Sequence, residues 1–413
     1  MLILSKPITK VKQKRREKVK ELKILSLFSG IGAFEKALYN INIDYKLIGF
    51  SEIDKYAIKS YCAIHGIDEK LNLGDITKID IEKLPRFIDI ITHGSPCQDF
   101  SIAGKQTGGD AGTNTRSSLM WNTVEIVKWC LPKYVIWENV RNILSPKHIH
   151  NFNKYIETLN ELGYNNYYEV LNAKDYGVPQ NRERIYTISI RKDIDNGRFK
   201  FPEKEVLHFR LKDILEAEVD EKYYLSERMV NGFIRHNEKH KQKGTGFIWK
   251  AKNEKDIANT LRANASLCPT DNTIKVIENL NIKGQDSIKR VYASEGISPT
   301  LTNMQGGNRQ PKIEVIGQAS NEGSQAGKVY SDKGISPSLC AGTHGYSMGN
   351  IQTNTRIRRL TPKECWELMG FSNKDFEKVA NIPTSDTQLY KQAGNSIVVP
   401  VLEKIFINLF KEV

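Results

Sequence analysis

Five short apolar runs, separated by stretches with helical spacing, constrain the fold of this chain more than any other feature. The runs cover residues 22–27, 46–50, 88–91, 134–137 and 185–190. Helical spacing of apolar residues marks 34–38, 57–61, 119–130 and 152–162. Strands that are apolar on both faces and alternate with helices are typical of a parallel sheet covered by helices. We therefore predict an α/β domain over residues 24–192.

The sequence changes character after about residue 192. Gly, Asn, Ser and Thr become frequent, and the segment 290–301 (RVYASEGISPTL) recurs 38 residues later as 328–339 (KVYSDKGISPSL). A fainter copy covers 257–261. Such spaced repeats indicate repeated structural units, which we predict to be β-hairpins of a second, mostly β domain at 193–355. The C-terminal part, 356–413, regains helical patterns at 362–369 and 397–410, so we predict that it packs back onto the first domain.

The charge of the chain is compatible with a nucleic-acid partner. Its 413 residues include 61 Lys and Arg against 48 Asp and Glu, a net charge of +13. Residues 1–23, a basic N-terminal extension, hold nine Lys or Arg against two Glu and therefore contribute +7 of that excess. A solvated tail and a tail that contacts phosphates both explain this composition.

The cysteines and the hydropathy of the chain indicate in which cellular compartment the protein is expected. The six cysteines include no Cys-x-x-Cys pair, so we predict neither a disulfide framework nor a metal site. We found no run approaching the roughly 20 apolar residues of a membrane helix and no signal peptide, and we expect a cytoplasmic protein without a membrane partner.

A small ligand is predicted at the loops that follow the first strands. Gly30 and Gly32 come between a strand and a helix, where the backbone can approach a ligand, although a plain strand–helix turn explains the same pattern. Glu52 ends the second strand, and a carboxylate there can accept both hydroxyl protons of a ribose. Asp75 follows another glycine. Because no phosphate-binding loop is present, we expect a nucleotide-like ligand that is neutral or cationic.

Cys97 is the candidate nucleophile. It lies in the loop 94–101 (GSPCQDFS), just after the strand at 88–91, and such loops commonly display reactive groups. The alternative is a small buried hydrophobic residue. Residues 102–118 contain four glycines and little apolar pattern, which predicts a mobile lid.

Three charged residues follow or precede the remaining strands. Glu138 ends the strand at 134–137 and is either a cap or ion-pair partner, or a proton donor whose pKa is raised by burial. Arg182 and Arg184 share one face of the last strand. They are either a solvated edge or a pair of fixed cations that bind an anion or a carbonyl group.

Eight short motifs, in this order, resemble those of the DNA (cytosine-5-)-methyltransferases of bacterial or phage restriction-modification type. They are 27–34 (LFSGIGAF), Glu52, 74–76 (GDI), 95–98 (SPCQ), 137–140 (WENV), 180–184 (QNRER), 359–364 (RLTPKE) and 392–396 (QAGNS). The resemblance implies a Rossmann-like S-adenosylmethionine-dependent methyltransferase domain and a smaller, mostly β target recognition domain. Two departures occur: Ser26 replaces an acidic residue that often opens the first motif, and Ala33 replaces a glycine.

The resemblance also implies roles for individual residues. Cys97 would add to carbon-6 of cytosine, Glu138 would hydrogen-bond or protonate ring N3, and Arg184 would contact the carbonyl oxygen, with Arg182 lining the same site. The residues implied to bind S-adenosylmethionine are Phe28, Gly30, Gly32, Glu52, Ile53, Asp75, Ile76, Pro96, Leu119, Asn395 and Ser396. The implied DNA contacts are Ser101, Gln325, which would fill the space of the flipped base, and Lys328.

We therefore predict an enzyme that methylates carbon-5 of a flipped cytosine in a specific sequence of double-stranded DNA. It would act as a monomer and protect DNA from restriction, beside a separately acting cognate endonuclease or in a phage. Two alternatives stay open: methylation of tRNA on the same catalytic frame, and a catalytically inactive DNA-binding protein. The 38-residue repeat adds the hypothesis that more than one target sequence is recognised.

Overall fold

The computed structural model describes most of the chain. The described residues are 21–96, 116–244, 249–252, 255–261, 273–276, 291–292, 312–313, 315–318, 328–330, 350–351 and 356–410. They form two compact units, each described below by itself: unit 1 is Met1–His208 with Trp366–Val413, and unit 2 is Phe209–Cys365.

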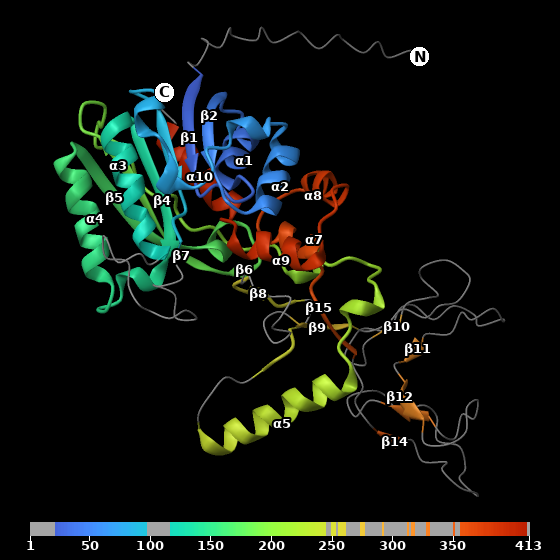
Figure 1. Cartoon of the computed structure of the whole chain (residues 1–413). Coiled ribbons are helices and arrows are strands. Elements are labelled where there is room, and N and C mark those ends of the chain that lie inside the picture. Colours follow the sequence, from blue (N-terminus) through green and yellow to red (C-terminus); the bar gives the residue numbers. More distant parts are fainter. Residues whose placement is uncertain are drawn as a thin grey trace, which may run out of the picture. The chain divides into compact units, whose positions relative to one another are not determined.

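Unit 1 is built around a six-stranded sheet with the order β2-β1-β3-β4-β7-β5 (Figure 1). Its strands are β1 (Leu22–Leu27), β2 (Tyr45–Ser51), β3 (Ile90–His93), β4 (Tyr134–Val140), β5 (Tyr164–Asn172) and β7 (Glu183–Arg191). The first four in sequence are parallel to one another, whereas β7 runs antiparallel to both of its neighbours. The predicted α/β fold is therefore confirmed, with a mixed rather than purely parallel sheet.

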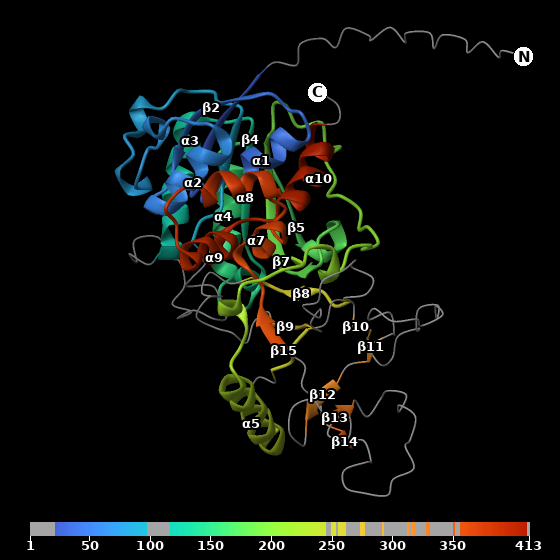
Figure 2. The same ribbon diagram turned by 90° about the vertical axis from the view of Figure 1, so that its right-hand side faces the viewer.

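Helices cover both faces of this sheet (Figures 1 and 2). They are α1 (Ala33–Asn40), α2 (Lys55–His65), α3 (Met120–Cys130), α4 (Ile149–Glu161) and α10 (Val399–Phe410). The C-terminal part also contains α7 (Pro362–Glu367), which spans the boundary between the units, α8 (Asn373–Ala380), which packs on α2, and α9 (Asp386–Asn395). On the α3 and α4 side, Leu27, Ile91 and Trp137 pack with Val127 and Phe152 in one apolar cluster. Because strand side chains alternate between the faces, residues next to these point to the other side, where α1 and α10 pack together.

The antiparallel direction of β7 follows from its connection to β5. Only ten residues separate Asn172 from Glu183, and they include a short 3-10 helix, Ala173–Tyr176, and strand β6 (Gln180–Asn181). A parallel connection needs a longer crossover that spans the sheet, so a short link returns the chain antiparallel. Strand β5 was not predicted: its central residues are partly exposed, as at the edge of a sheet, and lack a continuous apolar run.

The C-terminal segment belongs to unit 1, and polar contacts fix it there. The Lys36 ammonium of α1 lies 2.8 Å from Oδ2 of Asp375 on α8, and both side chains are buried. The Lys378 ammonium donates to the Ile64 carbonyl at 2.7 Å. Gln180 Nε2 donates to the carbonyl of Leu368 at 2.8 Å. These contacts join residues far apart in sequence and account for the compactness of unit 1.

Helices α9 and α10 form a long apolar segment. The segment Asp386–Phe410 is long and apolar enough to cross a membrane by composition alone, and half of the tested stretch is buried. It consists of two helices separated by 396–398, and α10 packs against α1. A core helix of a globular unit satisfies the same criterion, and we assign α10 to the core.

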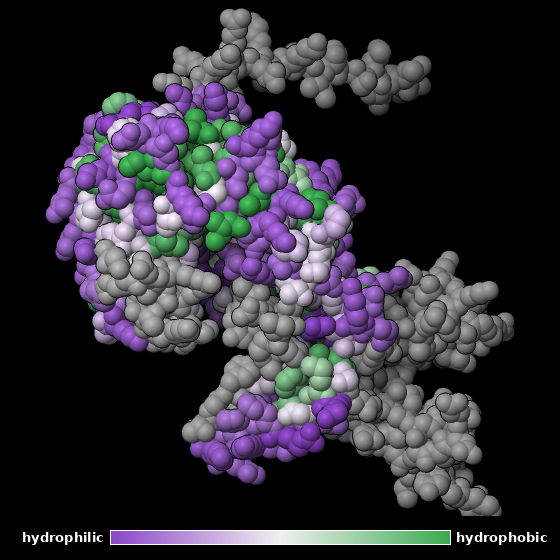
Figure 3. All heavy atoms as spheres, viewed as in Figure 1, coloured by the Kyte–Doolittle hydropathy of each residue, from purple (hydrophilic) through white to green (hydrophobic). Residues whose placement is uncertain are grey.

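The described part of unit 2 includes the long helix α5 (Glu227–Lys243), which begins at the capping residue Ser226 and ends at Gly244 in a left-handed conformation. Val230 and Phe233 of α5 pack with Trp249. Figure 3 shows that much of the surface of α5 is hydrophilic. The sequence pattern does not predict this helix, because few of its residues are apolar. The short strands of this unit are β8 (Ala258–Asn259), β9 (Thr273–Val276), β10 (Val291–Tyr292), β11 (Lys312–Ile313), β12 (Val315–Gln318), β13 (Lys328–Tyr330), β14 (Asn350–Ile351) and β15 (Arg356–Arg359).

The sequence repeat has a counterpart in strand pairing. Val291 of β10 pairs in parallel with Lys312, and Val329 of β13 pairs in parallel with Asn350, a separation of 21 residues in both copies. In the region of the fainter copy, the Lys252 amide donates to the Thr273 carbonyl, again 21 residues later. The predicted hairpin pairing occurs between β12 and β13, which are antiparallel and consecutive in sequence. The prediction is wrong for β10 with β11 and for β13 with β14, because these strands are parallel.

Candidate active site

The loop after β3 is held against the end of β4 by its own hydrogen bonds. Ser95 Oγ accepts from Trp137 Nε1 at 3.0 Å, and the Ser95 carbonyl accepts from Asn139 Nδ2 at 3.2 Å. Pro96 is the last described residue before 97–115, so Cys97 and Ser101 lie outside the described residues. The position of Ser95 therefore determines where the segment that carries Cys97 begins.

Glu138 is a buried carboxyl group between these two anchoring residues of β4. Its Oε1 lies 3.0 Å from Nε of Arg184, in an ion pair whose atoms lack hydrogen-bond alignment. A Cβ atom built on Gly94 would lie 3.9 Å from Glu138 Oε2, so the loop after β3 passes close to this carboxyl. Burial raises the pKa of Glu138 above its ordinary value, although Arg184 and Arg182 oppose that rise. Glu138 therefore favours its protonated form more than an exposed glutamate does.

Arg182 is buried and connects the start of β7 with the C-terminal segment. Its Nη2 donates to the carbonyls of Gly394 at 3.1 Å and Ser396 at 2.8 Å, at the C-terminal end of α9. Its backbone amide donates to Asn172 Oδ1. Arg184 is less buried, and its Nη1 donates to the Glu183 carbonyl. The two arginines thus differ: the Arg182 side chain donates hydrogen bonds to backbone carbonyls, whereas the Arg184 side chain forms an ion pair with Glu138.

The loop between β1 and α1 has an unusual backbone. Phe28, Gly30 and Gly32 all have positive φ angles, 53°, 56° and 81°, a conformation that only glycine adopts without strain. The Gly30 amide donates to Glu52 Oε2 at 2.9 Å, which ties this loop to the end of β2. A Cβ built on Gly30 would meet no described atom within 4 Å, so open space lies beside the backbone there.

Glu52 organises the end of β2. Its Oε1 accepts from the amides of Ile53 and Asp54, at 2.8 and 2.9 Å. Asn72, which the sequence analysis missed, accepts from the Glu52 amide and donates to its carbonyl. Ile53 follows with 75% of its surface exposed, which is unusual for a large apolar side chain.

The other residues predicted to bind the cofactor or DNA differ in burial and position. Asp75 Oδ1 accepts from the amide and hydroxyl of Thr77, hydrogen bonds that lower the Asp75 pKa. Ile76 is buried, Leu119 is half-buried and ends a short 3-10 helix, and Asn395 is exposed at the end of α9. Gln325 lies outside the described residues, and Lys328 is the first residue of β13 in unit 2.

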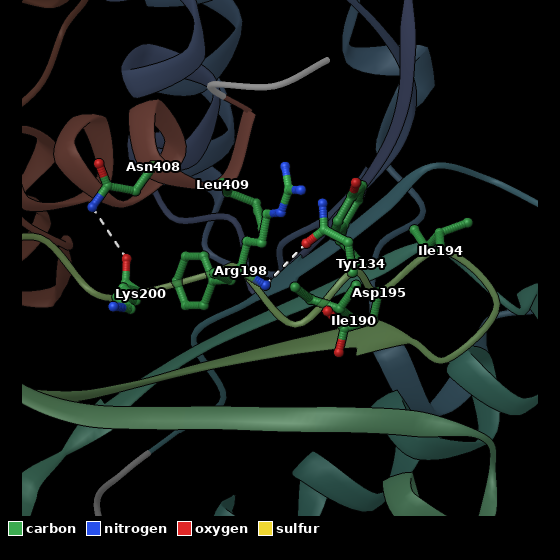
Figure 4. Close-up of a pocket in the computed structure, with 10 residues that line it drawn as sticks. Tyr134, Ile190, Ile194, Asp195, Arg198, Lys200, Asn408 and Leu409 are labelled. Atoms are coloured by element: carbon green, nitrogen blue, oxygen red, sulfur yellow. Dashed lines mark hydrogen bonds between the residues drawn. The ribbon is translucent and has the colours of Figure 1, made fainter.

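The residues of unit 1 that the motifs singled out gather at one edge of the sheet. Glu52 and Glu138 mark that edge, where the parallel strands β1 to β4 end, which is where ligands bind in open α/β sheets. A cavity of about 410 Å³ lies at the opposite edge (Figure 4). It is lined by Tyr134, Ile190, Ile194, Asp195, Asn196, Arg198, Phe199, Lys200, Asn408 and Leu409. No predicted site residue lines this cavity, and we place the candidate active site at the carboxyl edge.

Comparisons with known proteins identify the family. Residues 22–411 match the family model described as C-5 cytosine-specific DNA methylase. The chain is 37% identical to the orphan methyltransferase M.Rho11sI of Bacillus phage rho11s, over 94% of this chain and 97% of the relative. It is 30% identical to the type II methyltransferase M.HhaI of Haemophilus parahaemolyticus, over 94% of each chain.

Solved structures agree on the fold. The Dnmt2 methyltransferase of S. pombe aligns with a TM-score of 0.59 at 18% identity, over 95% of this chain and 99% of that one. The methyltransferase EhMeth of Entamoeba histolytica aligns with a TM-score of 0.62 at 16% identity, over 95% and 99%. With the match of the family model over nearly the whole chain, these findings show that the chain belongs to the C-5 cytosine-specific DNA methylase family and is a DNA (cytosine-5-)-methyltransferase.

Proposed function

We propose that this enzyme transfers a methyl group from S-adenosylmethionine to carbon-5 of a flipped cytosine within a specific duplex sequence, through a covalent bond from Cys97 to carbon-6. The observation that carries the proposal is the buried Glu138 carboxyl, paired with Arg184 and close to the loop that leads to Cys97. The proposed domain limits are 1–23, 24–192, 193–355 and 356–413.

The chemistry requires each of these groups. Carbon-5 of cytosine is a poor nucleophile until a thiolate adds to carbon-6, and a proton on N3 makes carbon-6 electrophilic. Cys97 would form the bond to carbon-6 while Glu138, whose pKa is raised by burial, supplies the proton. Carbon-5 of the adduct would then take the methyl group as its bond to the sulfonium breaks, which leaves S-adenosylhomocysteine. Loss of the carbon-5 proton, return of the N3 proton to Glu138 and expulsion of the Cys97 thiolate would restore the aromatic ring.

The two arginines support different parts of this scheme. Arg184 would donate to the cytosine carbonyl oxygen, and its contact with Glu138 would keep the guanidinium beside the proposed proton donor. Arg182 is buried and donates to the Gly394 and Ser396 carbonyls, so its role would be to hold the C-terminal loop at the site.

The carboxyl edge also fits S-adenosylmethionine, which would supply an electrophilic methyl group. The open space beside Gly30 and the exposed Ile53 provide a bare backbone and an apolar surface, the latter suited to an adenine ring. Glu52 lies between these features and would accept from the ribose hydroxyls. Phe28, Gly32, Asp75, Ile76, Pro96, Leu119, Asn395 and Ser396 complete the proposed binding set.

The proposed DNA partner and biological role are based on the relatives of this chain. Several relatives with 37% identity are orphan methyltransferases of Bacillus phages, and others are type II methyltransferases of bacteria. We propose that this chain modifies double-stranded DNA as a monomer, alone or beside a separately acting endonuclease. Unit 2 would supply the recognition surface, with Gln325 and Lys328 near the bases and Ser101 in the catalytic loop.

Methyl transfer from labelled S-adenosylmethionine to duplex DNA tests the proposal, with bisulfite sequencing to locate the methylated cytosines. We expect label at one or a few short sequences, and none with the Cys97→Ala variant, whose cofactor affinity should stay near that of the wild type. Transfer to tRNA but not to duplex DNA would replace the proposed substrate. Specific DNA binding without transfer would indicate an inactive binding protein.

The covalent step has its own test. Duplex DNA that carries 5-fluorocytosine at the target position cannot lose a proton from carbon-5, so the Cys97 adduct should persist and survive denaturing electrophoresis. The same DNA with the Cys97→Ala variant is the control. Full turnover by that variant would exclude Cys97 as the nucleophile.

A further inference from the structure

Two side chains of α2 occupy the space that a side chain at position 32 would need. A Cβ atom built on Gly32 would lie 2.1 Å from Nε2 of His65 and 2.9 Å from Cε2 of Tyr61. Atoms at such separations overlap, so the imidazole and the phenol ring lie directly against the backbone of Gly32. The loop between β1 and α1 is therefore in close contact with α2.

His65 is also hydrogen-bonded to this loop. Its Nε2 lies 3.1 Å from the carbonyl oxygen of Ile31. A carbonyl only accepts, so Nε2 carries the proton and donates. Burial lowers the pKa of His65 to about 4, with Lys36, Lys378 and Asp375 as the charged groups that face it. The imidazole is therefore neutral at neutral pH, and this bond determines its tautomer.

The position of His65 is set by the helix and not by the loop. The ring of His65 packs on Tyr61 with centroids 4.8 Å apart, and Tyr61 stacks on Phe50 of β2 at 4.2 Å. Asp54 caps the start of α2 by accepting from the amides of residues 56 and 57. The capping by Asp54 and the stacked rings fix the position of α2. The loop between β1 and α1 packs against this helix.

We infer that His65 is a positioning residue for S-adenosylmethionine binding: its hydrogen bond to Ile31 holds the loop 28–32 in the left-handed conformation that leaves open space beside Gly30. The inference rests on the proposed function, since it assigns that loop to the cofactor. It predicts that loss of the bond weakens cofactor binding without slowing the chemical step.

The test compares two variants of the full-length protein. His65→Phe retains a flat ring of similar size but has no donor, whereas the side-chain amide of His65→Gln can donate to the same carbonyl. Calorimetric titration with S-adenosylmethionine and S-adenosylhomocysteine, without DNA, measures binding. Methyl transfer at varied cofactor concentration then separates KM from kcat, and the melting temperature reports on folding.

We expect His65→Phe to bind both ligands about tenfold more weakly and to raise KM for the cofactor by a similar factor, which corresponds to one hydrogen bond. Its kcat at saturating cofactor should stay within about twofold of the wild type. His65→Gln should recover most of the affinity. A role in stability alone would lower the melting temperature of His65→Phe and leave its cofactor affinity unchanged.

Two outcomes are decisive and distinguishable. If the wild type binds the cofactor and both variants bind it equally well, His65 does not position the loop. If the wild type itself binds neither ligand, the proposed cofactor is wrong, and the inference falls with it.

Discussion

Glu138 and Glu35 are both buried carboxyl groups of unit 1, yet their surroundings differ. Glu138 has an arginine at 3.0 Å, whereas Glu35, on α1, lies near the hydroxyl groups of Ser26 and Tyr61. Burial raises the pKa of both groups. For Glu138 the raised pKa serves the proposed proton transfer, and for Glu35 it bears on stability. Each carboxyl therefore leads to its own prediction.

Replacing Glu138 by Gln should lower kcat for methyl transfer by at least about a hundredfold, because the amide cannot give up a proton to the base. The wild-type rate should fall as pH rises through the raised pKa of Glu138, since the protonated form is the competent one. That alkaline limb should be absent from the pH–rate profile of the Glu138→Gln variant. Glu183→Gln, which changes an exposed partner of Arg141, is the control and should keep nearly full activity.

Replacing Glu35 by Gln should stabilise the protein at alkaline pH. A folded-state pKa above the unfolded one favours folding fully only at low pH, and this contribution is lost as pH rises through the raised value. The loss is about 1.4 kcal/mol for every pH unit by which burial raises that pKa. Urea unfolding of Glu35→Gln and wild type at pH 5 and pH 8 should show a gain that grows with pH. Glu161→Gln on the exposed end of α4 should show none, and a pH-independent loss for Glu35→Gln would contradict the prediction.

At the scale of elements, two glycines with left-handed backbones can be compared: Gly32 at the junction of β1 with α1, and Gly66 at the end of α2. Gly32 has φ 81° and would clash with α2, whereas Gly66, which ends α2, has φ 66° and no described atom within 4 Å of a built Cβ. A side chain at either position would strain the left-handed backbone, but only at position 32 would it also overlap neighbouring atoms.

Gly66→Ala should therefore lower the free energy of unfolding by about 1 kcal/mol, the cost of the left-handed backbone. Gly32→Ala should lower it by about 3 kcal/mol, because overpacking against His65 and Tyr61 adds to that strain. Urea unfolding followed by tryptophan fluorescence measures both. Equal losses would mean that the space beside Gly32 is not filled in solution.

Elements with a continuous apolar pattern could be predicted from the sequence, and others could not. The strand 22–27 has the same bounds in the structure, and 134–137 was extended to Val140 by pairing of Glu138 with Tyr186 of β7. The sequence does not predict this extension, because the polar Glu138 ends the apolar run. Motifs located the strand ends that carry Glu52 and Glu138, but the contact of Gly30 with Glu52 depends on two strands being neighbours in the sheet. Local periodicity carries no such information.

For the whole molecule, the ion pair between Lys36 and Asp375 joins the two sequence segments of unit 1 and is almost entirely buried. Lys36→Met would leave the Asp375 carboxylate buried without its cation, and we expect a loss of about 3 kcal/mol in the free energy of unfolding. Lys391→Met removes a more exposed pair with Asp54 and should cost less than about 1 kcal/mol. Chemical unfolding of both variants checks the contrast, which would be contradicted by similar losses.

The contacts of Arg182 have a consequence for the order of synthesis. Its two carbonyl partners, Gly394 and Ser396, follow it by more than 200 residues, with all of unit 2 translated in between. At roughly 5–20 residues per second, ten seconds or more separate the emergence of this guanidinium from that of the groups that accept its protons. The ribosome therefore synthesises all of unit 2 before the C-terminal partners of Arg182 exist. The hydrogen bonds from Arg182 to the end of α9 can therefore form only when translation is nearly finished.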